Sequence, residues 1–310
     1  MSLKHILEIL DAVDSPDASG ADVSELFARH GWDDVRTETV AGEVGTTDFV
    51  KVVVPGSDGK SGGGNAPTLG IVGRLGGLGA RPEAVGYVSD GDGAVAALGA
   101  ALKLADMHLR GDVLAGDVIV GTHVCPDAPT KPHDPVPFMD SPVAMSTMNE
   151  KEVDPEMDAV LSIDTTKGNR LVNHRGIAIS PPVKEGWILR LTDGLLDIYQ
   201  SVTGHPPVVL PLAMQDITPY GNGVHHVNSI LQPATATAAP VVGVALTAES
   251  VVPGSATGAS HETDVALAVR YAIEVAKLFG LGKLAFYDEG EFERLVRLYG
   301  SMKGLQGAAL

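Results

Sequence analysis

Three side chains that can bind a metal ion stand at turn-like positions of the sequence. Asp90 follows an apolar, strand-like run and begins an acidic, glycine-rich turn that passes directly into an alanine-rich helix pattern. Asp164 ends a second apolar run, and His261 lies in a turn of small residues before the last long helix pattern. Open α/β sheets bind their ligands at the carboxyl ends of the strands. We therefore expect these three side chains to converge on one cleft.

Carboxylate and imidazole groups together suit zinc, manganese or iron. A hydrolytic metal site also needs an open position for water and a group that moves the proton of that water. His123 follows another strand pattern, and an imidazole titrates near neutrality, so we expect it to be a fourth ligand or the base. The set Asp90, Asp164, His261 and His123 suits one metal ion better than two. Asp92 could contact one of these ligands, rather than the metal, and so orient it.

Each of these residues also has a purely structural interpretation. Asp90 could cap the helix that follows it, with glycines supplying the turn. Asp164 could be a turn residue at the end of a strand, and His261 could cap the last long helix. His123 could be a buried histidine whose ring nitrogens form hydrogen bonds within the core. Cys125 is more typical of an inert buried thiol than of a nucleophile. Both interpretations stay open at this point.

Two further segments carry candidate ligands. His225 and His226 are adjacent, so we expect them to face opposite ways and one of them to be structural. The segment 126–154 contains six prolines, which oppose both helix and central strand. Such long loops are often functional. His133, Asp134 and Asp140 could therefore reach the same cleft, or the segment could be a surface excursion or a dimer contact.

Composition limits the classes of partner. The 310 residues are 44% hydrophobic, enough for a full core, and 22 basic against 39 acidic residues give a net charge of −17. This charge disfavours nucleic acid and anionic membranes as partners. One cysteine allows no intrachain disulfide and no thiolate zinc cluster, and neither a signal-peptide pattern nor a membrane-length apolar run is present. We expect a soluble, cytoplasmic homo-oligomer that acts on a small-molecule or peptide-like substrate.

The elements that must position these residues alternate along the chain. Apolar runs separated by helix patterns are typical of a mainly parallel sheet covered on both faces. We expect a single α/β domain over 1–310, with N-terminal helices and a strand pair in 1–66, a core in 67–281 and a C-terminal helix in 282–310. The expected helices are 2–13, 21–30, 94–109, 184–203, 263–279 and 290–299, and the expected strands are 36–40, 49–54, 69–72, 118–122, 159–163, 176–180, 208–210 and 240–246.

The segment 86–105 resembles the co-catalytic metallo-exopeptidases, the zinc aminopeptidase and carboxypeptidase group. In that group an aspartate after a strand bridges two metals, and a Gly-x-x-Ala-Ala-Leu helix follows. The resemblance spans about residues 67–281; it places Asp90 on the bridging position, Asp164 on a terminal ligand and His261 on the histidine turn before the last helix. The whole chain also resembles an uncharacterised bacterial family, a domain of unknown function. The resemblance implies a three-layer α/β/α sandwich and a metal-dependent hydrolase, with zinc as the expected metal and manganese or iron as alternatives.

Two motifs of those exopeptidases are replaced here. Where the group has a His-x-Asp pair, this chain has Arg74, whose guanidinium is always protonated and cannot bind a metal. Where the group has a Glu-Glu pair, this chain has His123 and Cys125. We expect an altered metal site in which His123 is a ligand or the base and Arg74 clamps a substrate carboxylate. The alternatives are an inert relative that binds a small ligand or a protein partner, and a structural component of an oligomer.

Overall fold

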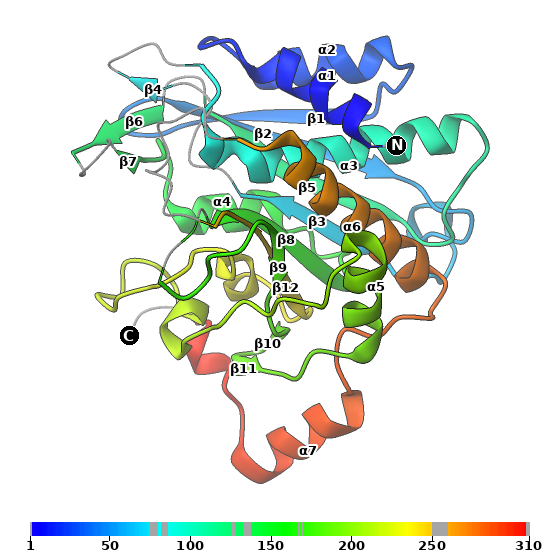
Figure 1. The fold of residues 1–310 in the computed structure, drawn as a ribbon, viewed down its shortest axis with the longest axis vertical. Helices are drawn as coiled ribbons and strands as arrows, with labels where there is room; N and C mark the ends of the chain where they lie inside the picture. Colours follow the sequence, from blue (N-terminus) through cyan, green and yellow to red (C-terminus); the bar gives the residue numbers. More distant parts are fainter. Residues whose placement is uncertain are drawn as a thin grey trace.

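A nine-stranded sheet forms the middle of the described part of the molecule (Figure 1). The computed structural model describes residues 2–74, 80–81, 86–125, 128–132, 138–166, 168, 170–249 and 260–307. The strands follow the order β1 (Val35–Ala41), β2 (Thr46–Val54), β5 (Val118–Val124), β3 (Leu69–Gly73), β8 (Ala159–Thr166), β12 (Val241–Thr247), β10 (Val183–Lys184) and β11 (Trp187–Ile188), and β9 (Gly176–Ile179) also pairs with β12.

The four central strands of this sheet are parallel. β3 pairs in parallel with β5 and β8, and β8 pairs in parallel with β12. Their continuous apolar runs are buried because both faces of the sheet are covered. The flanking strands are antiparallel: β1 pairs with β2, β2 with β5, and both β9 and β10 with β12. The expected α/β fold with a mainly parallel centre is confirmed.

Long helices cover one face of the sheet. Helices α3 and α6 pack on each other, α3 also contacts β3, β5 and β8, and α1 packs on α3. The alanine-rich sequence of α3 lets it approach the sheet closely, and nearly all of its residues are buried. The helices of this layer are α1 (Leu3–Val13), α2 (Gly20–Arg29), α3 (Asp92–Leu109), α5 (Asp193–Thr203) and α6 (Glu262–Gly280).

The opposite face is covered by a thinner layer of short helices and irregular segments. Its apolar cluster includes Val72 and Val160 from the sheet and Ile230 and Leu231 from the covering chain. The helices that lie here are α4 (Met145–Glu152), η3 (Met214–Ile217) and η4 (Gln232–Thr235). η2 (Ser89–Gly91) leads into α3 and contacts β8, and η5 (Lys303–Leu305) places Leu305 against the second apolar cluster. The remaining elements are η1 (Lys60–Gly62), α7 (Glu289–Tyr299) and a small sheet of β4 (Ala80–Arg81), β6 (Ala128–Lys131) and β7 (Phe138–Met139).

The start of α3 lies directly against the ends of β3 and β8. A Cβ atom added to Gly93 would lie 2.3 Å from the Arg74 carbonyl oxygen and 2.5 Å from the Ile163 carbonyl oxygen. Only glycine permits such an approach of backbones. Gly93 therefore brings the turn that carries Asp90 next to the strands that carry Arg74 and Asp164.

Three predicted elements are wrong. Residues 184–191 are not helical: Glu185 and Gly186 have φ values of 48° and 80°, which make the two-residue turn of the β10–β11 hairpin, and α5 begins only at Asp193. The segment 208–210 makes a single bridge, from Val209 to Ile179. The residues just before η2 are not a strand either, because Val88 is extended but pairs with no strand in the described chain.

None of the described helices has the length and apolar character to cross a membrane. The division of the chain into one domain with three parts stays a prediction.

Candidate active site

A cavity of about 1090 Å³ opens at the carboxyl ends of β3 and β8. This volume slightly exceeds the usual range of about 300 to 1,000 Å³ for small-molecule sites. Arg74 lines it from the end of β3, Asp164 from β8 and Asp90 from η2. The other walls are the β1–β2 turn, the segment 140–148 and the segment 226–230, together with Thr165, Thr166, Gly168 and Tyr220.

The Asp164 carboxylate is held by two hydrogen bonds. Thr165 donates its backbone N–H to Oδ1 at 2.7 Å, and Ser229 donates its hydroxyl to Oδ2 at 3.0 Å. Burial raises the pKa of the Asp164 carboxyl above its ordinary value, while these two hydrogen bonds and the charge of Arg74 oppose that rise. A carboxyl with a raised pKa exchanges a proton more readily near neutral pH.

The turn that carries Asp90 is tied to β8 and to the start of α6. The Thr165 hydroxyl donates to the carbonyl oxygen of Ser89 at 3.1 Å, which joins the neighbour of Asp164 to the neighbour of Asp90. Asp92 is fully buried; it accepts hydrogen bonds from the Tyr87 hydroxyl and from the Ser260 hydroxyl. Asp92 therefore ties the turn to Tyr87, which precedes it, and to Ser260, which precedes α6.

Arg74 is held in a fixed position, with only 4% of its surface exposed. Its Nη2 donates to the Asn149 side-chain oxygen, and its Nη1 donates to the Met145 sulfur at 3.1 Å. Its Nε lies 3.3 Å from Glu152 Oε2, as an ion pair without the geometry of a hydrogen bond. Three residues of α4 thus hold this guanidinium against the cavity wall.

Glu152 also binds His123, so that a buried network links β5, α4 and β3. His123 Nδ1 contacts Glu152 Oε1, and both side chains are inaccessible to solvent. Burial alone would lower the pKa of His123, but the adjacent Glu152 carboxylate, with Cys125, outweighs it and raises that pKa to about 10. His123 is therefore an imidazolium in the folded protein at neutral pH. His123, Glu152 and Arg74 together carry one net positive charge beside Asp164.

The other predicted site residues lie elsewhere. His261 is exposed at the N-cap position of α6 and does not line the cavity, and His123 lies wholly beneath it. No three His, Cys, Asp or Glu side chains of the described residues are placed to hold a metal ion. Asp140 does line the cavity. His133 and Asp134 lie outside the described residues.

Of the two adjacent histidines, His226 lines the cavity and His225 is exposed. His226 bonds to Thr218 and packs edge-on against Tyr220, with ring centroids 4.4 Å apart. Cys125 is buried, 3.3 Å from the Thr47 hydroxyl. Sequence reasoning did not identify Glu152, Asn149 or Ser229, because each stands in a polar stretch whose burial depends on distant segments.

A family model matches residues 38–309 and is described as "Protein of unknown function (DUF1177)". The chain belongs to this DUF1177 family. No curated protein matches the sequence. The expected resemblance to a domain of unknown function is thereby confirmed.

Two solved structures are similar in fold to this DUF1177 protein. One, described as "Bottromycin maturation enzyme BotP in complex with Mn", is 15% identical with a TM-score of 0.51, over 89% of this chain and 71% of that chain. A cytosol aminopeptidase from Coxiella burnetii is 12% identical with a TM-score of 0.52, over 88% of this chain and 68% of that chain. At these identities the similarity shows the fold alone.

The buried network predicts a dependence of stability on alkaline pH. The pKa of His123 is raised from 6.5 to about 10. Between these values the unfolded chain releases the proton that the folded chain keeps, so the free energy of unfolding should fall as the pH rises. The slope from one such group is at most about 1.4 kcal/mol per pH unit. Urea unfolding across this range should show the slope in the parent protein and a flatter profile in His123→Gln. The exposed His225→Gln is the control, and equal slopes in parent and His123→Gln would contradict the assignment.

Proposed function

We propose that this DUF1177 protein hydrolyses small peptide-like amides in the cavity at the ends of β3 and β8. The observation that carries the proposal is the position of Arg74 and Asp164 in the wall of one cavity. A fixed cation can position a substrate through its carboxylate, and a carboxyl of raised pKa can transfer a proton, two functions that amide hydrolysis uses. The peptidase-like fold, and the names of the similar structures as a maturation enzyme and an aminopeptidase, support this substrate class.

Arg74 is suited to bind a substrate carboxylate. The partner of its Nη1 is the Met145 thioether, which is a weak acceptor. A carboxylate oxygen is a much stronger acceptor, so a substrate that displaces Met145 gains a charge-assisted hydrogen bond. Glu152 and Asn149 keep the guanidinium plane in place during this exchange, because they bind its Nε and Nη2.

Asp164 is suited to move a proton in the same cavity. Each of its oxygens accepts one hydrogen bond from the protein and keeps a further acceptor site. In the proposed mechanism Asp164 takes a proton from the attacking water and then delivers it to the leaving amine. Arg74 lowers the energy of the ionised Asp164 and attracts the negative substrate group.

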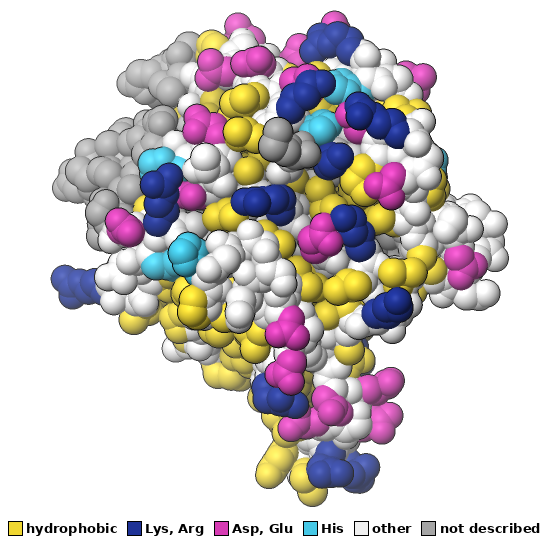
Figure 2. Space-filling model, turned by 45° about the vertical axis from the view of Figure 1, so that its right-hand side comes forward, with side chains coloured by type: hydrophobic (Ala, Val, Ile, Leu, Met, Phe, Trp, Pro, Cys, Tyr) yellow, Lys and Arg dark blue, Asp and Glu magenta, His cyan; other side chains and the backbone are white. Residues whose placement is uncertain are grey.

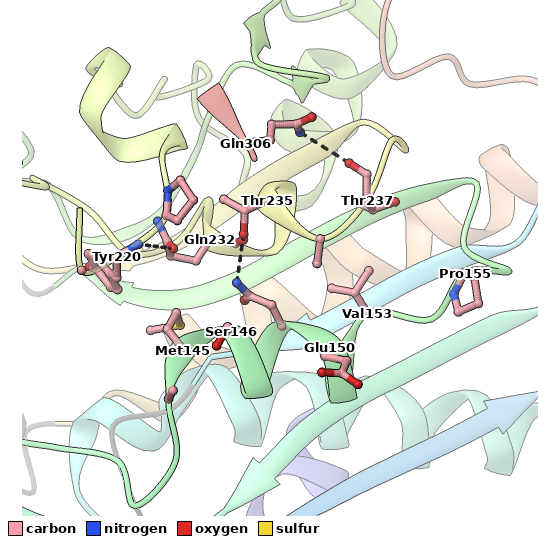
Figure 3. A pocket seen from close by; sticks show the side chains of 15 residues that line it. Met145, Ser146, Glu150, Val153, Pro155, Tyr220, Gln232, Thr235, Thr237 and Gln306 are labelled. Atoms are coloured by element: carbon pink, nitrogen blue, oxygen red, sulfur yellow. Dashed lines mark hydrogen bonds between the residues drawn. The ribbon is translucent and has the colours of Figure 1, made fainter. Parts of the chain in front are cut away.

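A second cavity of about 690 Å³ adjoins the first and extends the proposed site (Figure 3). Ala144, Met145 and Tyr220 line both cavities. The second lies between α4 and η4, and its polar side chains are mainly hydroxyls and amides that suit the N–H and C=O groups of a peptide backbone. They are Ser146, Asn149, Glu150, Gln232, Thr235, Thr237 and Gln306. A substrate longer than a single amino acid is therefore expected.

A divalent metal fits the described residues only in part. Asp90 and Asp164 offer two carboxylates, but the histidines of the expected set, His123 and His261, are respectively buried beneath the cavity and exposed outside its lining. Asp140 adds a third carboxylate to the lining, but no three His, Cys, Asp or Glu side chains of the described residues are placed to hold one ion, as a typical catalytic zinc site requires. No step of the proposed mechanism passes through a metal; the BotP structure, described as a complex with Mn, is the reason to include metals in the assay.

A second candidate function has its own support. Arg74 places a permanent cation where the exopeptidases have a metal-binding histidine, and Glu152 and Asn149 hold it there. A protein that binds peptide-like carboxylates without cleaving them would need only this part of the site. Binding without turnover is the result that would favour this candidate.

The proposal is tested with a mixture of small peptides and N-acyl amino acids, analysed for hydrolysis products by mass spectrometry. The protein is assayed with added Mn²⁺, with added Zn²⁺ and with a chelator. We expect products from substrates that carry a free carboxylate. Retention of turnover in the chelator would support catalysis by the chain's own residues, whereas loss restored by one metal would show that a metal takes part. Binding without any product would replace the hydrolase by the second candidate.

A further inference from the structure

Tyr220 lies where the two cavities meet. Its side chain is in the lining of both, a position that it shares with Ala144 and Met145. The side chains of Ala144 and Met145 have no hydrogen-bond donor, so Tyr220 supplies the donor among these three. A peptide that extends from the first cavity into the second passes the Tyr220 hydroxyl.

The fold holds Tyr220 in place from two sides. Its backbone N–H donates to the side-chain oxygen of Gln232 at 3.2 Å (Figure 3), and Gln232 is wholly buried. Its ring packs edge-on against His226, which is itself anchored at 3.0 Å from the carbonyl oxygen of Thr218. The Gln232 side-chain NH2 donates to that same carbonyl oxygen at 2.7 Å. The Tyr220 ring is therefore positioned before any substrate binds.

The Tyr220 hydroxyl is close to Asp164. Ser229 donates its proton to Asp164 Oδ2 at 3.0 Å, and Ser229 also interacts with the Tyr220 hydroxyl. Burial raises the pKa of Tyr220 above its ordinary value, whereas Ser229 and the charge of Arg74 oppose that rise. Tyr220 is thus a neutral donor at neutral pH. One hydroxyl separates it from the Asp164 carboxylate, so the two groups are about 6 Å apart, or two hydrogen-bond lengths.

This separation leaves room for one water molecule and one amide carbonyl between the two groups. When water attacks, its oxygen bonds to the carbonyl carbon, the C=O electron pair moves to the carbonyl oxygen, and Asp164 takes the water proton. When the C–N bond then breaks, Asp164 gives that proton to the leaving nitrogen. The charge on the carbonyl oxygen between these two steps needs a hydrogen-bond donor. Arg74 is not available for it, because the substrate carboxylate occupies the guanidinium.

We propose that Tyr220 is a further catalytic residue of this site, whose hydroxyl donates to the carbonyl oxygen of the amide that is cleaved. The inference rests on the proposed hydrolysis. It places the reacting amide at the junction of the two cavities, between the Asp164 carboxylate and the Tyr220 hydroxyl.

The test is Tyr220→Phe, which removes the hydroxyl but keeps the ring against His226 and the backbone bond to Gln232. With a peptide that the parent protein cleaves, kcat should fall by about 100- to 1,000-fold, as on removal of one donor to an oxyanion. KM should stay nearly unchanged, because the hydrogen bond strengthens only as charge develops on the oxygen.

Tyr299→Phe is the matched control and should keep the parent kcat. Tyr299 is 70% exposed and is absent from the lining of both cavities. It lies on α7, which projects at the lower end of the molecule (Figure 1). The space-filling view shows that end as a narrow projection (Figure 2).

A second measurement does not use turnover. In a phosphinic isostere of the same peptide, a tetrahedral group with an anionic oxygen replaces the amide and resembles the transition state. Titration calorimetry in a chelator should show that Tyr220→Phe lowers the affinity for the isostere by about the same factor as kcat. The affinity for the peptide itself, measured in Asp164→Asn with and without Tyr220→Phe, should not change.

The outcomes separate this inference from the proposed function. If the parent cleaves the peptide and Tyr220→Phe turns it over as fast as Tyr299→Phe does, the role of Tyr220 is wrong and the hydrolase stands. A raised KM at unchanged kcat would make Tyr220 a group that binds the ground state and would also overturn the role. A parent protein that cleaves no peptide would overturn the proposed function and this inference with it.

Discussion

Glu152→Gln should lower the free energy of unfolding by about 3 to 5 kcal/mol, the usual cost of removing one partner of a buried ion pair. Glu152 is 1% exposed and contacts both His123 and Arg74. Without its charge, the buried Arg74 guanidinium loses its carboxylate, and His123 loses the interaction that keeps it protonated against the effect of burial. Chemical denaturation at neutral pH measures the change. The dependence of the unfolding free energy on denaturant concentration is fitted as one value shared by both proteins.

Glu150→Gln is the matched control for this experiment. Glu150 lies on the same helix, two residues earlier, and is exposed. Surface substitutions of this kind usually change stability by less than about 0.5 kcal/mol. If Glu152→Gln were no more destabilising than Glu150→Gln, the buried network would not be ionised as described.

Arg74→Gln should abolish the preference for a free carboxylate. The affinity of a peptide acid should fall by about 10- to 100-fold, because a charge-assisted hydrogen bond contributes about 1.5 to 3 kcal/mol. The matching peptide with a C-terminal amide should bind parent and variant about equally. Titration calorimetry with both peptides gives the acid-to-amide ratio within each protein, so any general loss of stability cancels. An acid preference that survives in Arg74→Gln would mean that another group binds the carboxylate.

The elements of the sheet and its helices were predictable because their signals are local. The continuous apolar runs of β3, β5, β8 and β12 and the spacing of α6 appear directly in the sequence. The β10–β11 hairpin was missed because it depends on the positive φ of Glu185, a residue that seldom adopts it.

The candidate site was less predictable because burial decides what each polar group does. Arg74, Asp90 and Asp164 stand at turns whose positions follow from the fold, and they line one cavity. His123 stands where the exopeptidases have their Glu-Glu pair. In this fold, however, α4 covers His123 and Glu152 binds it. The sequence 145–152 is polar and gives no sign that Asn149 and Glu152 are buried.

The most direct test of the central claim is the rate of peptide hydrolysis by Asp164→Asn beside the parent protein. Asparagine keeps the size: its oxygen can accept from the Thr165 N–H and its NH2 can donate to the Ser229 hydroxyl oxygen, but it cannot accept the proton of water. Loss of a general base lowers turnover by about 100- to 10,000-fold. Asp158→Asn, on the exposed side of the chain before β8, is the control and should keep full activity. We predict turnover in the parent and in Asp158→Asn, and a loss of this size in Asp164→Asn with substrate binding retained. Undiminished turnover in Asp164→Asn would contradict the account.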